Sequence, residues 1–227
     1  MKAAIEAINQ MQADGVICHY AVGGAVGATY YSEPASTSGL EIFVILPFNP
    51  DGSSVSRAAL QDYLMARGRR LSEDCFELGG WPVNFLVASN DLESAAVAGS
   101  LPASIDGERT WVMMAEHLVA IALTANRLRD RIWILRLAEA DAIDELTLKS
   151  ILNMHSLMNE WAQFEQEYPP RFPTNNETRR KLSALSFSEK VKILEKLRDR
   201  ERAIAASGLR RKKARDDDSP KYIQPNK

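Results

Sequence analysis

The chain has 227 residues, of which 45% are hydrophobic, and a formal net charge of −2. This length suits one moderate domain with a further segment, or two small domains, and the hydrophobic fraction is sufficient for a folded core. The near-neutral charge says little about partners, although basic residues gather near the C-terminus. No apolar run approaches the roughly 18 residues of a membrane span, so we expect no membrane association.

The cysteines and the N-terminal sequence give an expectation for the compartment. Cys18 and Cys75 lie in apolar sequence without the spacing of metal ligands, and both are interpreted as buried thiols. The sequence shows no signal peptide. We therefore expect a cytoplasmic protein in a reducing compartment.

The first elements in the chain lead to a glycine pair. Helical periodicity predicts a helix over residues 1–13 that covers one face of a sheet, and the apolar run 16–21 predicts a strand that ends just before Gly23-Gly24. Glycines there allow a sharp turn and a close approach to a ligand, and a helix that begins at Ala25 would direct free N–H groups at an anion. The pair therefore indicates either a phosphate site or only a tight turn.

A second signal follows the glycine pair after a short connector. The run 40–46 contains one charged residue, Glu41, and otherwise only apolar residues. This pattern is typical of a strand that is buried on both faces. An acid at the start of such a strand is a candidate functional residue.

Turn and periodicity signals predict further elements between residues 47 and 113. They are a helix at 55–67, a hairpin of strands at 75–78 and 81–87, a helix at 91–98 and a strand at 110–113. Together with the earlier strands, they predict an α/β (α+β) fold with a mixed sheet of about four or five strands.

From Ala115 onward the sequence has long helical periods. The predicted helices lie at 116–125, 128–138 and 144–167. We expect them to form a helical lobe that packs on the sheet. Within it, Arg127 and Asp130 stand three residues apart and are interpreted as a structural ion pair.

The C-terminal part begins with a proline-rich linker at 169–176, because prolines disfavour helix there. Amphipathic helices are expected over 177–208, with a narrow apolar stripe of Val191, Leu194 and Leu197. Such a stripe requires a partner, which is the chain's own front domain, a second copy or an antitoxin-like protein. Residues 209–227 are expected to form a disordered basic and acidic tail, and contact of its basic cluster with RNA is left open.

The glycine pair and the Glu41 strand resemble a known signature. Gly23-Gly24, a spacer and Gly39-Leu40-Glu41-Ile42 are similar to the nucleotidyltransferase superfamily motif of Gly-Gly or Gly-Ser followed by Asp-hydrophobic-Asp/Glu. More narrowly, the chain resembles small bacterial nucleotidyltransferases related to abortive-infection toxins of toxin–antitoxin systems. The segments that carry this likeness are Tyr20–Ala25, Glu33-Pro34, Thr37, Leu40–Val44, Trp81–Leu86, Glu116–Leu123, Arg127 and Asp130.

The resemblance implies a nucleotidyltransferase-like α/β domain at 1–113 and a helical lobe at 114–168, followed by the linker, helices and tail. It also implies that Mg²⁺ or Mn²⁺ and an NTP act here. The residues that it assigns to the nucleotide are Gly23, Gly24, Thr37, Ser38 and Arg127, and the catalytic metal ligand is Glu41.

The carboxylates of the motif are incomplete in this chain. In that family, carboxylates on alternate strand positions and on a neighbouring strand hold two divalent ions against the triphosphate. Here the first position is Gly39, and the equivalent on the neighbouring strand is the neutral Asn84. Transfer would need another acid, for which the candidates are Asp74, Glu77 and Asp91.

Two functions follow from these observations. The first is transfer of a nucleotidyl group from an NTP to a protein or RNA acceptor, in the setting of a toxin–antitoxin system. The second is a catalytically degenerate nucleotidyltransferase fold, a pseudoenzyme, that acts as a nucleotide-binding regulator or as a protein-interaction module through its C-terminal helix.

Overall fold

The computed structural model describes residues 1–48, 57–168 and 181–206. Its centre is a seven-stranded mixed sheet with the order β3-β4-β5-β2-β1-β7-β6. The strands are β1 (His19–Gly23), β2 (Leu40–Ile45), β3 (Arg69–Arg70), β4 (Cys75–Leu78), β5 (Trp81–Val87), β6 (Leu101–Ile105) and β7 (Glu108–Val112).

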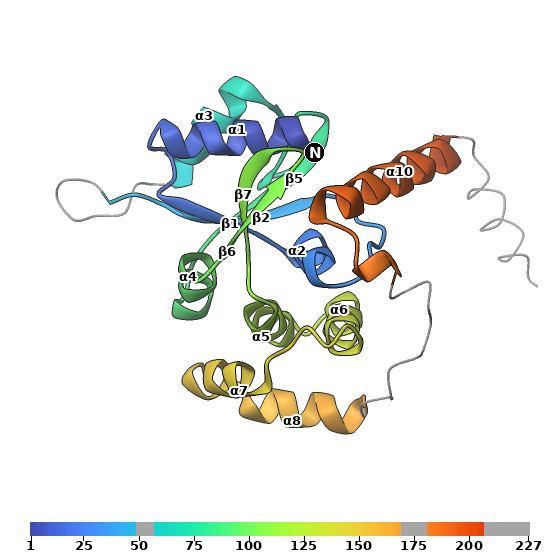
Figure 1. Ribbon diagram of the computed structural model, residues 1–227. Coiled ribbons are helices and arrows are strands. Elements are labelled where there is room, and N and C mark those ends of the chain that lie inside the picture. Colours follow the sequence, from blue (N-terminus) through green and yellow to red (C-terminus); the bar gives the residue numbers. More distant parts are fainter. Residues whose placement is uncertain (49–56, 169–180, 207–227) are drawn as a thin grey trace, which may run out of the picture.

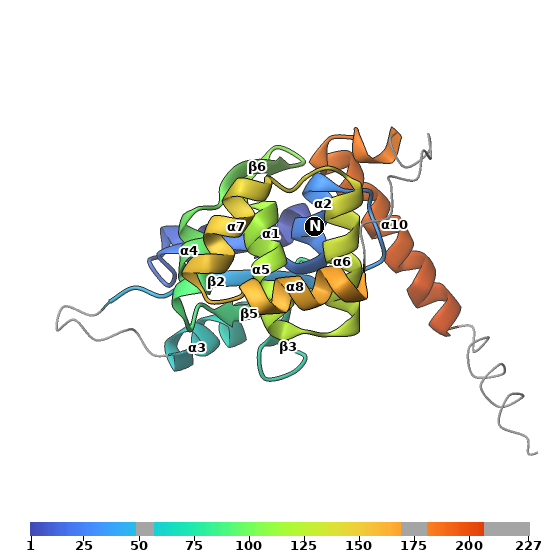
Figure 2. The same cartoon turned by 90° about the horizontal axis from the view of Figure 1, so that it is seen from below.

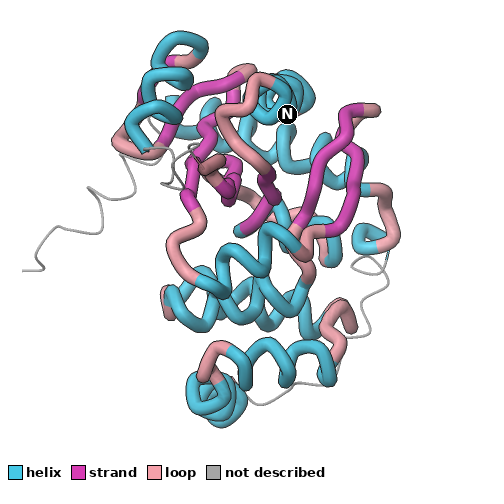
Figure 3. The backbone as a smooth tube through the Cα atoms, turned by 90° about the vertical axis from the view of Figure 1, so that its left-hand side faces the viewer, coloured by secondary structure: helices cyan, strands magenta, loops and turns pink. Residues whose placement is uncertain are grey.

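Helices cover both faces of this sheet. They are α1 (Lys2–Ala13), α2 (Gly24–Tyr31), α3 (Arg57–Arg67), α4 (Asp91–Ala98), α5 (Ala115–Ala125), α6 (Leu128–Glu139), α7 (Glu145–Met154), α8 (Met158–Glu167) and α10 (Phe187–Ala206). Figure 1 shows α1 and α3 on one side of the sheet and α4, α5 and α6 on the other, with α7 and α8 as an outer layer. In Figure 3 the strands lie among helices in the upper part of the tube, and the lower part contains only helices and loops.

Two apolar clusters follow this layering. One contains the buried side chains of α1 together with Ile42 and Val44 of β2. The other contains Phe43 of β2 and the apolar side chains of α5 to α8. Because successive strand residues face opposite sides, β2 is buried on both faces, as its apolar run predicts. Seen from the lobe side, α5, α6, α7 and α8 lie over the strands (Figure 2).

The central strands run in different directions, and their pairing places Gly23, Glu41 and Asn84 next to one another across the sheet. β1 pairs with β2 in antiparallel fashion, whereas β2 pairs with β5 and β1 pairs with β7 in parallel. The start of β2 therefore lies between the end of β1 and the start of β5.

The strand count of four or five is wrong, because the sheet has seven strands. β3 has only two residues, both exposed, and carries no alternation of apolar and polar residues. β6 contains Pro102 and is mostly exposed. Both lie at the edges of the sheet, where short strands and proline are tolerated and the apolar signal is weak.

The predicted helix at 144–167 is interrupted in the structure. α7 ends at Met154, and Ser156 adopts a left-handed backbone conformation with φ of 58° before α8 begins. The expectation that both cysteines are buried is also wrong. Cys18 is exposed and Cys75 is partly exposed. Cys18 precedes β1 and follows the buried Ile17, so the two side chains face opposite sides of the chain.

α10 packs against the front domain of its own chain. Val191 and Leu194 are fully buried in the cluster that contains β2. The buried Lys190 ammonium donates a hydrogen bond to the Tyr30 carbonyl oxygen at 3.0 Å, and the Arg198 guanidinium lies 3.7 Å from the centroid of the Trp81 ring. Val191 and Leu194 of the apolar stripe therefore pack on the chain's own domain, whereas Leu197 is partly exposed.

No helix in the described ranges is both long and apolar enough to span a bilayer. The predicted linker at 169–176 and tail at 209–227 lie outside the described residues. The domain boundaries and the cytoplasmic localisation stay predictions.

Candidate functional site

The glycine pair lies where β1 ends and α2 begins. Gly24 has φ of +53°, a conformation that a residue with a side chain adopts only with strain. A Cβ atom at Gly24 would overlap the Glu41 carboxylate, and one at Gly23 would lie 2.7 Å from the Phe43 ring. The pair therefore allows the β1–α2 turn to pass directly against the Glu41 side chain. No side chain caps the N-terminus of α2, so its first N–H groups are free to meet a ligand.

Glu41 stands at the centre of this region. It pairs with Gly23 of β1 on one side and with Asn84 of β5 on the other. Its side chain is only 25% exposed. Burial raises the pKa of the Glu41 carboxyl, while the guanidinium groups of Arg129 and Arg127 act in the opposite direction.

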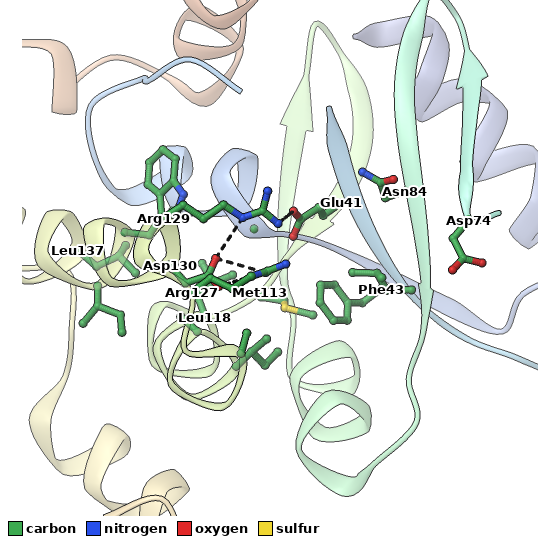
Figure 4. A pocket seen from close by; sticks show the side chains of 18 of the residues that line it. Glu41, Phe43, Asp74, Asn84, Met113, Leu118, Arg127, Arg129, Asp130 and Leu137 are labelled. Atoms are coloured by element: carbon green, nitrogen blue, oxygen red, sulfur yellow. Dashed lines mark hydrogen bonds and ion pairs between the residues drawn. The ribbon is translucent and has the colours of Figure 1, made fainter. Parts of the chain in front are cut away.

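The start of α6 brings an alternating set of charges against Glu41. The Arg129 Nη2 atom lies 3.9 Å from Glu41 Oε1, and its Nε atom lies 3.7 Å from Asp130 Oδ1. Arg127 Nε donates to Asp130 Oδ2 at 2.5 Å, which confirms the interpreted ion pair and raises the pKa of Arg127. Figure 4 shows these side chains facing the sheet from α6. The four charges compensate one another, so none of them is buried without a partner.

A cavity of about 440 Å³ opens between the sheet and the lobe at this point. Its polar rim comprises Gly24, Glu41, Ser72, Glu73, Asp74, Asn84, Arg127, Arg129 and Asp130. Its apolar wall includes Phe43, Leu86, Met113, Leu118, Ile121, Ala122, Ile134 and Leu137. Its volume and its mixture of apolar wall and convergent polar groups are typical of a small-molecule site.

The two neutral positions of the motif differ in what they tolerate. Asn84 lies directly opposite Glu41 on the adjacent parallel strand, so its side chain faces the same cavity. At Gly39, an added Cβ would lie 2.8 Å from the Pro82 carbonyl oxygen, a backbone atom that cannot turn aside. A carboxylate at position 84 therefore fits the present backbone, whereas one at position 39 requires the backbone to move.

The donors present do not fit a pair of divalent cations. Within residues 1–48, 57–168 and 181–206, no group of three or more His, Cys, Asp or Glu side chains is placed to hold a metal ion. Glu41 is paired with Arg129, and Asp74 is paired with Arg57 at 2.5 Å. Glu77 is paired with Arg69 at 2.6 Å on the exposed edge of the sheet. The requirement for Mg²⁺ or Mn²⁺ stays a prediction for which the described residues supply an incomplete ligand set.

The predicted site residues line two adjoining cavities. Gly24 and Glu41 line both of them, Arg127 lines the cavity just described, and Gly23 is the last residue of β1 before Gly24. Thr37 and Ser38 line a second cavity on the other side of Arg129. The Thr37 hydroxyl donates to the Gly39 carbonyl oxygen at 2.9 Å and so shapes its own loop.

Sequence reasoning missed the parts played by Arg129, Trp133 and Arg136. Arg129 contacts Glu41, and all three side chains line the second cavity. A charged helix is usually solvated, so the arginines of this helix gave no clear signal. The sequence nevertheless contains a signal: Arg129 and Arg136 are seven residues apart with Trp133 between them, a spacing that places all three on one helix face.

Together, the glycine turn, the strand carboxylate beside it and the helical lobe over the sheet define a nucleotidyltransferase-like fold. The structure is similar to a crystal structure of an antigenic nucleotidyltransferase-like protein from Paracoccidioides brasiliensis, with a TM-score of 0.53 and 11% sequence identity. The match covers 74% of this chain and 88% of that chain. At this identity the likeness shows the fold alone. No protein-family model matches the sequence, and no curated protein matches it.

Proposed function

We propose that this chain is a nucleotide-binding protein on a nucleotidyltransferase fold whose capacity for metal-dependent transfer is degenerate. The observation that carries the proposal is the ion pair between Arg129 and Glu41. A guanidinium lies against the strand carboxylate that would hold the metal, and the two accompanying positions are Gly39 and Asn84. This donor set is suited to an anionic ligand held by arginine and backbone amides.

In this proposal the ligand is a nucleoside triphosphate. Its phosphates lie against the free N–H groups of α2 and the guanidinium groups of Arg127 and Arg129, and its base and sugar lie on the apolar wall of the cavity. Each arginine exchanges a carboxylate for a phosphate oxygen, so its charge stays paired. Glu41 loses its ion pair in the exchange, and this favours its protonated form because burial already raises the pKa of Glu41.

The second candidate function is active nucleotidyl transfer to a protein or RNA acceptor. The observation in its favour is that Asp74 and Asp130 line the same cavity as Glu41. Both would first have to leave their arginine partners, which are Arg57 for Asp74 and Arg127 for Asp130. Both candidate functions are compatible with a role in a toxin–antitoxin system and with a protein partner for the C-terminal helix. These two points stay predictions.

Calorimetric titration with ATP, GTP, CTP and UTP, once in EDTA and once in Mg²⁺, tests the proposal. We expect at least one nucleotide to bind in EDTA. Arg129→Gln should weaken it by about tenfold or more, the usual effect of losing a charge-assisted hydrogen bond. Arg109→Gln is the matched control, because Arg109 is exposed on β7 and lines none of the cavities described.

Labelling with α-labelled nucleotides separates the two candidates. The parent should attach no label to itself or to total RNA. Label that appears with the parent and disappears with Glu41→Ala would establish transfer and overturn the degenerate assignment. A parent that binds no nucleotide in either buffer would contradict both.

A further inference from the structure

A second cavity, of about 350 Å³, lies on the other side of the contact between Glu41 and Arg129. The loop at residues 35–38 forms one wall and α6 forms the other. Its lining comprises Gly24, Ala25, Ala35, Ser36, Thr37, Ser38, Glu41, Arg129, Asp130, Ile132, Trp133 and Arg136. Its size is that of a small-molecule site, and Arg136 lines this cavity but not the first.

Arg136 is the unusual residue of this cavity. Its Nη1 atom is buried and has no hydrogen-bond partner. No residue in the described ranges forms an ion pair with it, whereas Arg127 and Arg129 each contact a carboxylate. A guanidinium carries five donors and a fixed positive charge. Because Arg136 lines the cavity and pairs with no carboxylate in the described ranges, an anion held in the cavity would compensate its charge.

The rest of α6 places an aromatic ring between two cations. Arg129, Trp133 and Arg136 stand at positions i, i+4 and i+7 of the helix and therefore share one face. The Arg136 guanidinium lies 5.1 Å from the centroid of the Trp133 ring. A cation beside an exposed aromatic face is the arrangement that binds a nucleotide, because the ring stacks on a base while the guanidinium meets its phosphate.

The loop opposite α6 supplies further polar groups. Ser36 and Ser38 are exposed at its surface and line the cavity, so their hydroxyl groups are available to phosphate or ribose oxygens. The internal hydrogen bond of Thr37 to Gly39 holds the loop in shape. The cavity thus offers arginine, hydroxyl and aromatic groups to one ligand.

We propose that this second cavity binds a nucleotide phosphate monoester, either a free nucleoside monophosphate or the phosphorylated end of a single-stranded RNA. Its contacts are Arg136 with the phosphate and Trp133 with the base. The inference rests on the proposed function in that the triphosphate occupies the first cavity, which leaves the second for another ligand. The two cavities share Gly24, Glu41, Arg129, Asp130 and Trp133, so they adjoin one another.

The test titrates AMP and adenosine into the full chain, alone and after saturation with ATP. AMP should bind in both cases, adenosine should bind more weakly, and Arg136→Gln should reduce the AMP affinity by about tenfold or more without changing the ATP affinity. Arg136→Lys keeps the charge and should retain part of the affinity, and Arg109→Gln should change neither ligand. Unchanged thermal unfolding of the variants shows that they fold.

Fluorescence anisotropy with a short single-stranded RNA, with and without a 5′-phosphate, identifies the source of the phosphate. Tighter binding of the phosphorylated strand that Arg136→Gln abolishes indicates an RNA end, whereas binding of AMP alone indicates a free nucleotide. Competition between AMP and ATP, or AMP binding that Arg136→Gln does not weaken, would overturn the second site while the proposed function stands. Absence of binding by all four nucleoside triphosphates would instead contradict the proposed function itself.

Discussion

Replacing Asn84 by aspartate should create a divalent cation site that the parent lacks. Asn84 and Glu41 are paired on neighbouring strands, which lie about 4.8 Å apart. Two carboxylates at roughly 5 Å repel each other by about 3 kcal/mol with an effective dielectric constant of about 20. Because the Glu41 side chain is 25% exposed, solvent screening reduces the expected cost to about 1–2 kcal/mol. For a chain of this size, such a cost lowers the melting temperature by about 2–8 °C in EDTA.

The assay is thermal unfolding of the parent and of Asn84→Asp, in EDTA and in Mg²⁺. A cation present at about a hundred times its dissociation constant stabilises the folded state by about 2.7 kcal/mol, so Mg²⁺ should more than reverse the loss in Asn84→Asp. Asn153→Asp is the control for added charge, because Asn153 is exposed on α7. It should respond little to Mg²⁺, as should the parent.

Two results would refute this reasoning. If Asn84→Asp melts at the parent temperature in EDTA and is unaffected by Mg²⁺, the two side chains do not face one cavity. If Mg²⁺ stabilises the parent as strongly as Asn84→Asp, the parent already holds a complete ligand set, and the description of its donors as insufficient is wrong.

Three further predictions concern stability. Gly24→Ala should lower the free energy of unfolding in urea by about 2 kcal/mol or more, because the left-handed conformation is strained for alanine and the new Cβ overlaps Glu41; a neutral effect would contradict this turn geometry. Leu194→Ala in α10 should cost about 2–5 kcal/mol in a single unfolding transition, whereas a separate early transition would mean that α10 unfolds on its own. Because burial raises the pKa of Glu41 in the folded state, the contribution of Glu41 to stability falls as the pH rises from the ordinary value of 4.5 through the raised pKa. Glu41→Gln should therefore gain stability relative to the parent over that pH interval. If the difference in unfolding free energy between the two proteins is the same at every pH, the pKa of Glu41 is not raised.

The central part of the fold could be predicted because its signals are local. The strand at 40–46 is apolar on both faces. The glycine pair at 23–24 marks the turn at which the preceding strand ends. The edge strands β3 and β6 could not be found in this way, since strands at a sheet edge bury little and are defined by their neighbours.

The site was predictable only in part. Glu41 lies in a motif, but the position of Asn84 beside it depends on the pairing of β2 with β5, which no local pattern determines. The contact of Arg129 with Glu41 depends on how the lobe packs against the sheet. Long-range packing of this kind also places Val191 and Leu194 of α10 in the core of the chain's own domain.

The narrow space at Gly39 makes position 39 a harder place than position 84 to introduce a carboxylate. A single substitution is sufficient at position 84, where the side chain is already the isostere of aspartate and faces the cavity. At position 39 a new side chain meets the Pro82 carbonyl oxygen, so a second change, at the start of β5, must come with it. The two positions are therefore unequal as places for a carboxylate: one substitution is enough at position 84, whereas position 39 also requires a change in the neighbouring backbone.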